Sequence, residues 1–218
     1  MTMTRISRAG ALVVLAAGTL AGCFGGLLES DTPADETYRV GQRLAPPAPA
    51  ATGDALGFAL VVGRPRASTA LDTTRIAVAP GASRFDYYTG VRWAEPAPQM
   101  VQQALVTALA ASGRYAGVFA APSRSPAELM LDVELRQFEA VASSPEAAPN
   151  VQVQLQASLV DARRATRVDS FVADAQVAAS ENSRAAIMAA FEAAMQQVVA
   201  ETVRRIDQAA TKVPATLQ

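Results

Sequence analysis

The strongest constraint on the fold is a strict alternation of apolar and polar residues in two segments of the second half of the chain. Residues 151–159 place Val, Val, Leu, Ala and Leu at the odd positions and Gln, Gln, Gln and Ser at the even ones. Residues 129–135 alternate in the same way. Because successive side chains of a strand point to opposite faces, each segment predicts a strand with one buried and one solvated face. We expect the two strands to be adjacent and antiparallel.

Two helical patterns can cover the apolar face of these strands. Residues 98–111 are opened by Pro96 and Pro98, carry apolar residues at helical spacing and are followed by Ser112 and Gly113, which end the helix. Residues 183–210 carry a longer apolar stripe that includes Ile187, Phe191 and Val198. The combination predicts an α+β fold. It should be a single domain in which a mostly antiparallel sheet has two main helices packed on one face.

Other segments give weaker signals. Residues 56–62, 74–78 and 171–177 read as further strands, and residues 85–93 read as a hairpin that turns at Thr89 and Gly90. In the register of residues 129–135, Phe138 falls on the solvated face. We therefore expect Phe138 to cover a sheet edge or to touch a partner.

The N-terminus reads as a targeting segment. A basic region with Arg5 and Arg8 precedes the uncharged, largely apolar stretch 9–20, which is shorter than the about 20 residues that a membrane-spanning helix needs. The sequence Leu-Ala-Gly-Cys at positions 20–23 matches the bacterial lipobox. This match predicts a signal peptide over residues 1–22 and acylation of Cys23, palmitate being a typical chain. Acyl chains on Cys23 would anchor the protein without spanning the membrane. The alternative is an ordinary secretory signal followed by an unmodified cysteine.

The rest of the chain divides by composition. Residues 23–55 are rich in Pro and Ala and read as the lipidated cysteine and a tether, within which Tyr38–Val40 can form a first strand. Residues 56–210 read as the folded domain, and residues 211–218 read as a C-terminal tail.

Composition argues against most catalytic functions. The 218 residues include no His and a single Cys, which removes His-based acid–base catalysis, Cys–His nucleophiles and the usual zinc ligands. The formal net charge is −1, which gives no general attraction to nucleic acid. We expect no enzyme activity, no cofactor, no metal and no nucleic-acid partner.

The segment from Tyr87 to Pro98, Tyr-Tyr-Thr-Gly-Val-Arg-Trp-Ala-Glu-Pro-Ala-Pro, leads into the first predicted helix. With the lipobox, the Tyr-Arg-Val at 38–40, Arg114-Tyr115, residues 134–139 and residues 190–194, it resembles the ABC-type transport auxiliary lipoproteins. These are the PqiC-like proteins that accompany MCE-domain lipid transport systems. The resemblance covers roughly residues 38–205.

The resemblance implies a non-catalytic accessory subunit on the outer-membrane side of a phospholipid transport path. Its partners would be an MCE-domain protein and, through it, the ABC permease and ATPase. Phospholipid binding, self-association and anchoring in the inner membrane stay open. A different class of function, an outer-membrane pilotin or assembly factor, is the alternative.

A protein of this kind would work by contact, and interfaces are enriched in aromatic residues and Arg. The candidate partner-binding residues are Tyr87, Tyr88, Arg92, Trp93 and Phe138. For Trp93 and Tyr88 the competing interpretation is burial in the core. At least one of Tyr87 and Tyr88 should be partly exposed, because neighbours in a strand point to opposite faces.

Overall fold

The computed structural model describes residues 34–42, 55–81 and 84–213. The described residues from Asp35 onward belong to one compact unit. The predicted signal peptide, Cys23 and most of the predicted tether lie outside the described residues.

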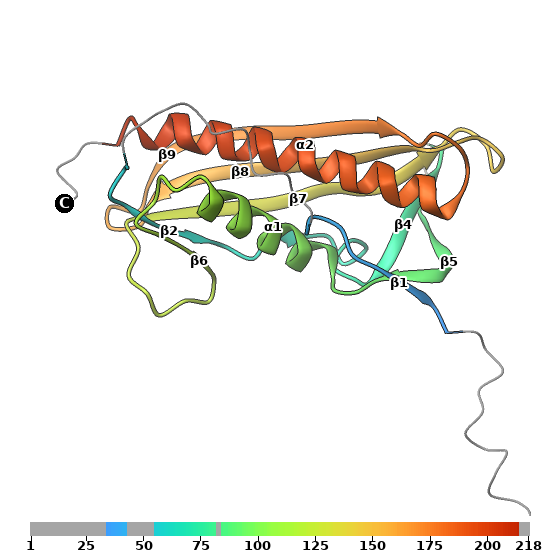
Figure 1. The fold of residues 1–218 in the computed structure, drawn as a ribbon, viewed down its shortest axis with the longest axis horizontal. Helices are drawn as coiled ribbons and strands as arrows, with labels where there is room; N and C mark the ends of the chain where they lie inside the picture. The colour runs from blue at the N-terminus through green and yellow to red at the C-terminus, as the bar shows by residue number, and fades with distance from the viewer. Residues whose placement is uncertain (1–33, 43–54, 82–83, 214–218) are drawn as a thin grey trace, which may run out of the picture. The chain divides into compact units, whose positions relative to one another are not determined.

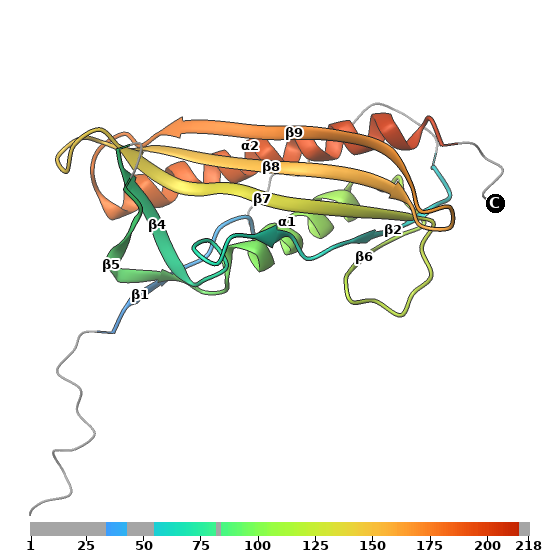
Figure 2. The ribbon, with the colours of Figure 1, turned by 180° about the vertical axis from the view of Figure 1, so that it is seen from behind.

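Three long strands form the centre of the sheet. β7 (Leu129–Ala142), β8 (Asn150–Asp161) and β9 (Thr166–Ala178) follow one another as an antiparallel meander (Figure 2). The odd residues of 129–135 and 151–159 are buried, and the glutamines of β8 lie half-buried on the other face. The predicted adjacency and orientation of these strands are therefore confirmed.

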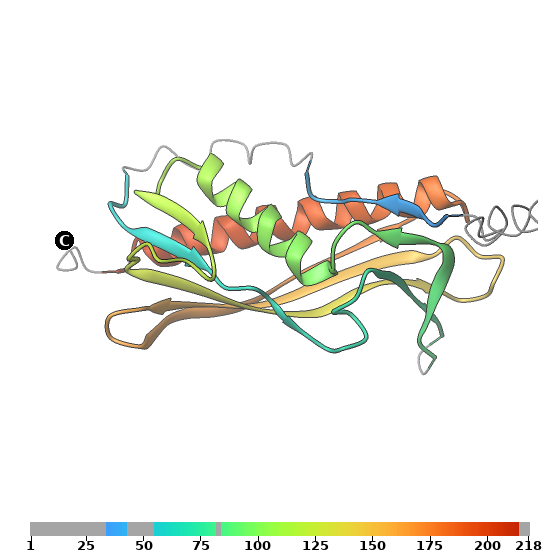
Figure 3. The ribbon, with the colours of Figure 1, turned by 90° about the horizontal axis from the view of Figure 1, so that it is seen from below.

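Both helices lie on one face of the sheet, and no helix of the described residues covers the opposite face (Figure 3). α1 (Ala97–Ala111) begins after Pro96, and α2 (Arg184–Ala210) begins after Ser183, whose hydroxyl accepts a hydrogen bond from the Ala186 amide at 3.3 Å. α2 covers β8 and β9, while α1 packs against α2, β6 (Gly117–Ala120) and β2 (Ala59–Val62). The α+β fold with two helices on one face is thus confirmed.

The first half of the chain supplies short strands that extend the sheet beyond β7. They run in the spatial order β1-β5-β4-β7-β2-β6, and β3 also pairs with β7. The pairs of β7 with β2, β3 and β4 are parallel, as are β1 with β5 and β2 with β6. Their bounds are β1 Glu36–Tyr38, β2 Ala59–Val62, β3 Arg66–Ala67, β4 Arg75–Pro80, β5 Asp86–Trp93 and β6 Gly117–Ala120.

Strand β7 runs from one end of the domain to the other. Its first residues pair with β2, and its last residues pair with β4, which in turn pairs with β5. We call the end that carries β1, β4, β5 and the loop between β7 and β8 the β5 end. The end that carries β2, β6, the turn between β8 and β9 and the C-terminus of α2 is the β2 end (Figure 1).

The predicted hairpin at residues 85–93 is wrong. The segment is one strand, β5, which passes through Gly90 with φ of +70° and pairs with β1 on one side and β4 on the other. Between the pairs Ala77–Tyr87 and Arg75–Arg92, β5 has four residues where β4 has one. The glycine signal for a turn therefore marks a large bulge here, because the strand continues beyond Gly90 to Trp93.

The prediction for Phe138 is also wrong, because its side chain is only 1% exposed. The register of β7 against β8 shifts between Leu135 and Gln137, where a β-bulge places one extra residue in β7. One extra residue exchanges the two faces of a strand. Beyond the bulge, the even-numbered Phe138 and Ala140 point into the core.

Candidate functional site

The β5 end carries a group of aromatic and arginine side chains that we call the aromatic–arginine patch: the exposed Arg75, Phe85 and Arg92 and the half-buried Tyr87. Arg75 comes from β4, and the other three come from β5 or the residue just before it. Sheet register brings them together, since Arg75 pairs with Arg92 and Ala77 pairs with Tyr87. Residues two apart in register lie on the same face of a sheet.

The patch is organised around the ring of Tyr87. The guanidinium carbon of Arg75 lies 3.6 Å from the centroid of this ring, and Phe85 meets the ring edge-on with 5.3 Å between centroids. The Tyr87 hydroxyl donates a hydrogen bond to the Ala70 carbonyl at 3.0 Å, which fixes the ring in place. Phe85 remains 42% exposed, so a large apolar side chain faces solvent in the same patch as the two arginines.

The charges of the patch are not balanced within the described part of the chain. There, no carboxylate lies within ion-pair distance of Arg75 or Arg92. Asp86, which lies between Phe85 and Tyr87 in the chain, already accepts hydrogen bonds from the Tyr87 amide at 2.8 Å and from Arg84 at 3.3 Å. These bonds lower the pKa of Asp86, the amide contributing most, so this carboxylate is charged and occupied. The patch therefore presents net positive charge.

The remaining predicted site residues lie elsewhere. Trp93 and Phe138 are each 1% exposed and form a buried cluster with Phe191 of α2, with ring centroids 5.1 to 5.6 Å apart. Tyr88 is half-buried against the core, and this burial raises the pKa of its hydroxyl. Trp93 and Phe138 can therefore support a surface but cannot themselves touch a partner.

Sequence reasoning missed Arg75. It lies far in sequence from the aromatic-rich stretch, and only the pairing of β4 with β5 places it beside Arg92. Arg92 and Tyr87 were found because they lie in one aromatic-rich stretch. A signal available in the sequence was the isolated arginine at the start of a strand otherwise made of apolar residues.

The described residues hold no group of three or more Cys, Asp or Glu side chains that could bind a metal ion. Within the same ranges, neither helix combines the length and the apolar character that crossing a membrane requires.

Comparison with known proteins identifies relatives of the chain. Residues 42–203 match the family described as ABC-type transport auxiliary lipoprotein component. A crystal structure of a Xanthomonas campestris protein assigned to the DUF330 family is 26% identical, with a TM-score of 0.71, and the alignment covers 81% of this chain and 96% of that one.

A second solved structure, of an uncharacterised protein, is similar in fold alone. It is 13% identical, has a TM-score of 0.60 and aligns over 79% of this chain and 99% of its own length. No curated protein is significantly similar in sequence.

Proposed function

The chain belongs to the family of ABC-type transport auxiliary lipoproteins, and we propose that it is a non-catalytic docking subunit of an MCE-type phospholipid transport system. In this role it would hold the MCE-domain protein, and through it the permease and ATPase, at the periplasmic face of the outer membrane. The family supports an accessory role in ABC transport, and the finer assignment rests on the lipobox and on the patch.

The lipobox supports membrane attachment through Cys23, the chain's only cysteine. Two or more acyl chains make attachment stable, because each buried methylene contributes about 0.8 kcal/mol and one chain alone binds only marginally. The residue after Cys23 is Phe24 rather than the Asp that retains lipoproteins in the inner membrane of enterobacteria. This supports the outer membrane as the destination.

The observation that carries the docking role is the uncompensated charge of the aromatic–arginine patch. Two guanidinium groups without carboxylate partners among the described residues share this patch with an exposed phenyl ring. Arg and aromatic side chains are over-represented among residues that dominate binding energy. A partner with carboxylates around an apolar contact would complement this surface, and complementary charge also speeds association.

The test is the affinity of the cognate MCE protein for the double variant Arg75→Ala, Arg92→Ala. We expect binding to weaken by about 1–3 kcal/mol, a roughly 5- to 150-fold rise in Kd, which should shrink at high salt. The matched control is Arg167→Ala, which removes an exposed arginine of β9 at the β2 end. Circular dichroism should show the same fold for all variants. If the double variant and the control lose the same affinity, or if neither loses affinity, the interface lies outside the patch.

A further inference from the structure

We call residues 36–42, which include β1, the latch. Contacts of these residues hold the N-terminal part of the domain at the β5 end (Figure 3). β1 pairs in parallel with β5, so that Thr37 lies beside Arg92 of the patch. The carbonyl of Tyr38 accepts a hydrogen bond from the Ala94 amide at 2.7 Å. The carboxylate of Glu36 pairs with Arg184, at the start of α2, at 3.0 Å.

After β1 the latch crosses the groove between the two helices. Val40 is 4% exposed, and Gly41 adopts φ of +79°, a conformation that favours glycine. The Gly41 amide donates a hydrogen bond to the Glu192 carboxylate of α2 at 2.7 Å.

Gly41 also fits tightly between the two helices. A Cβ atom at this position would lie 3.1 Å from the Cβ of Ala104 in α1 and 3.3 Å from the Cγ of Met195 in α2. Open hollows flank the latch, one lined by Met100 and Gln103 of α1 and the other by Met188 and Glu192 of α2. Val40 is therefore buried, and the adjacent Gly41 combines a backbone conformation that favours glycine with a hydrogen bond to a carboxylate.

We infer that the latch sets where the membrane tether joins the domain and so makes the β5 end the membrane-facing end. This inference rests on the proposed lipidation of Cys23. With the latch closed, only residues 24–35 separate the lipidated cysteine from β1, a span of at most about 40 Å. If the latch were released, the tether would comprise residues 24–55, which span up to about 110 Å when fully extended.

The consequence is a preferred orientation of the domain relative to the bilayer. The two ends lie at opposite ends of strand β8, which is about 40 Å long because its twelve residues each advance about 3.3 Å. A short tether that leaves from β1 therefore keeps the aromatic–arginine patch nearer the bilayer than the turn between β8 and β9. The transport partner would meet the patch close to the membrane surface.

Two cysteine variants at opposite ends of the same sheet test this inference. Ser144→Cys lies in the loop between β7 and β8 at the β5 end, and Ala162→Cys lies in the turn between β8 and β9. Both sites are exposed and belong to neither the latch nor the patch. Each full-length lipidated protein is labelled with a donor dye and bound to phosphatidylethanolamine and phosphatidylglycerol vesicles whose headgroups carry an acceptor dye. We expect clearly stronger energy transfer from position 144 than from position 162.

Gly41→Val is the variant that opens the latch, because valine disfavours this φ and its side chain would overlap both helices. β1 has only three residues, two of them exposed, and is not expected to hold alone. We expect the difference between positions 144 and 162 to fall at least twofold, and trypsin to cleave after Arg39. Gly113→Val is the matched control, because Gly113 has φ of +66° but no atom within 4 Å of an added Cβ. It should keep the wild-type difference.

The outcomes separate this inference from the proposed function. Equal transfer from both positions, in protein whose Cys23 is acylated by mass spectrometry, would overturn the membrane-facing role of the β5 end and leave the anchor intact. A difference that survives in Gly41→Val would overturn the role of the latch. An unmodified Cys23 with no vesicle binding would refute the anchor itself and the inference with it.

Discussion

The two ends of the domain are stabilised by different chemistry. Inside the β5 end, Trp93, Phe138 and Phe191 form a buried aromatic cluster, and the arginines of the patch remain outside without carboxylate partners in the described residues. Inside the β2 end, Tyr115 donates a hydrogen bond to Asp207 at 2.7 Å, and Asp207 is only 3% exposed. The β5 end thus buries an aromatic cluster, whereas the β2 end buries a hydrogen-bonded carboxylate.

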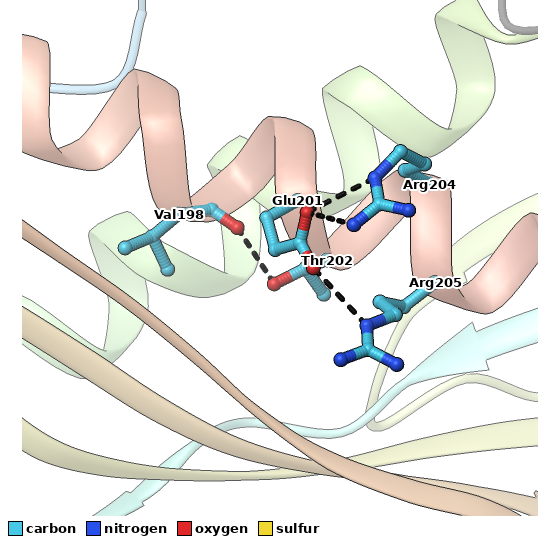
Figure 4. A network of polar contacts seen from close by, with 5 residues as sticks. All are labelled: Val198, Glu201, Thr202, Arg204 and Arg205. Carbon is cyan, nitrogen blue, oxygen red and sulfur yellow. Dashed lines mark hydrogen bonds and ion pairs between the residues drawn. The ribbon is translucent and has the colours of Figure 1, made fainter.

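Several polar side chains at the surface of the β2 end are paired with one another, although the exposed Arg167 of β9 forms no ion pair among the described residues. Glu128 accepts hydrogen bonds from the Ala59 amide and from Arg163, each at 2.9 Å. On the C-terminal half of α2, Glu201 binds Arg204 and Arg205, and the buried Thr202 hydroxyl donates to the Val198 carbonyl at 2.7 Å (Figure 4). Side chains already bound within the fold have little capacity left for a partner. This contrast is the reason to look for docking at the β5 end.

The largest expected effect comes from removing the aromatic cluster. Trp93→Ala should lower the free energy of unfolding by about 3–5 kcal/mol, because it leaves a cavity between Phe138 and Phe191. Urea unfolding followed by far-ultraviolet circular dichroism measures it, since Trp93 is the only tryptophan. Phe85→Ala, at the exposed ring of the same end, should change stability by less than about 0.5 kcal/mol. Similar losses for the two variants would contradict the division between core and patch.

A smaller loss is expected at the β2 end. Tyr115→Phe removes the hydroxyl that binds Asp207 and leaves a buried carboxylate without this donor. The expected cost is about 1–3 kcal/mol in the free energy of unfolding, measured by the same urea titration. A neutral result would mean that Asp207 gains its stabilisation from another group, and Arg114 is the nearby charged candidate.

The smallest effect concerns pH. Burial raises the pKa of Asp207 above its ordinary value of 3.8, against the opposing effects of Tyr115 and Arg114. A carboxyl with a raised pKa in the folded state binds its proton more tightly there than in the unfolded chain. Its contribution is therefore greatest at acid pH and is lost as the pH rises through the folded-state pKa.

Asp207→Asn removes this titration while keeping an oxygen that can accept from Tyr115. We expect the stability of the wild type relative to this variant to fall between pH 4 and pH 7, as measured by urea unfolding at a series of pH values. Other carboxylates titrate in both proteins, so their effects cancel in the difference. Parallel pH profiles would show that Asp207 does not carry a raised pKa.

The sequence was sufficient for the regular part of the fold. Strands β7, β8 and β9 and helix α2 were predictable because a long run of alternating or helically spaced apolar residues fixes both the element and its buried face. Tyr87 and Arg92 of the patch were predictable because they lie within six residues of one another in the chain.

Only the tertiary structure decided the rest, because it depends on register between segments far apart in sequence. One extra residue in β7 turned Phe138 into the core, and the pairing of β4 with β5 brought Arg75 to Arg92. The place of Gly41 between α1 and α2 has no local signal at all, since the tight space arises from Ala104 and Met195, which are more than sixty residues away along the chain. Local periodicity records which face of an element is buried, whereas contacts between distant elements decide which exposed side chains end up together.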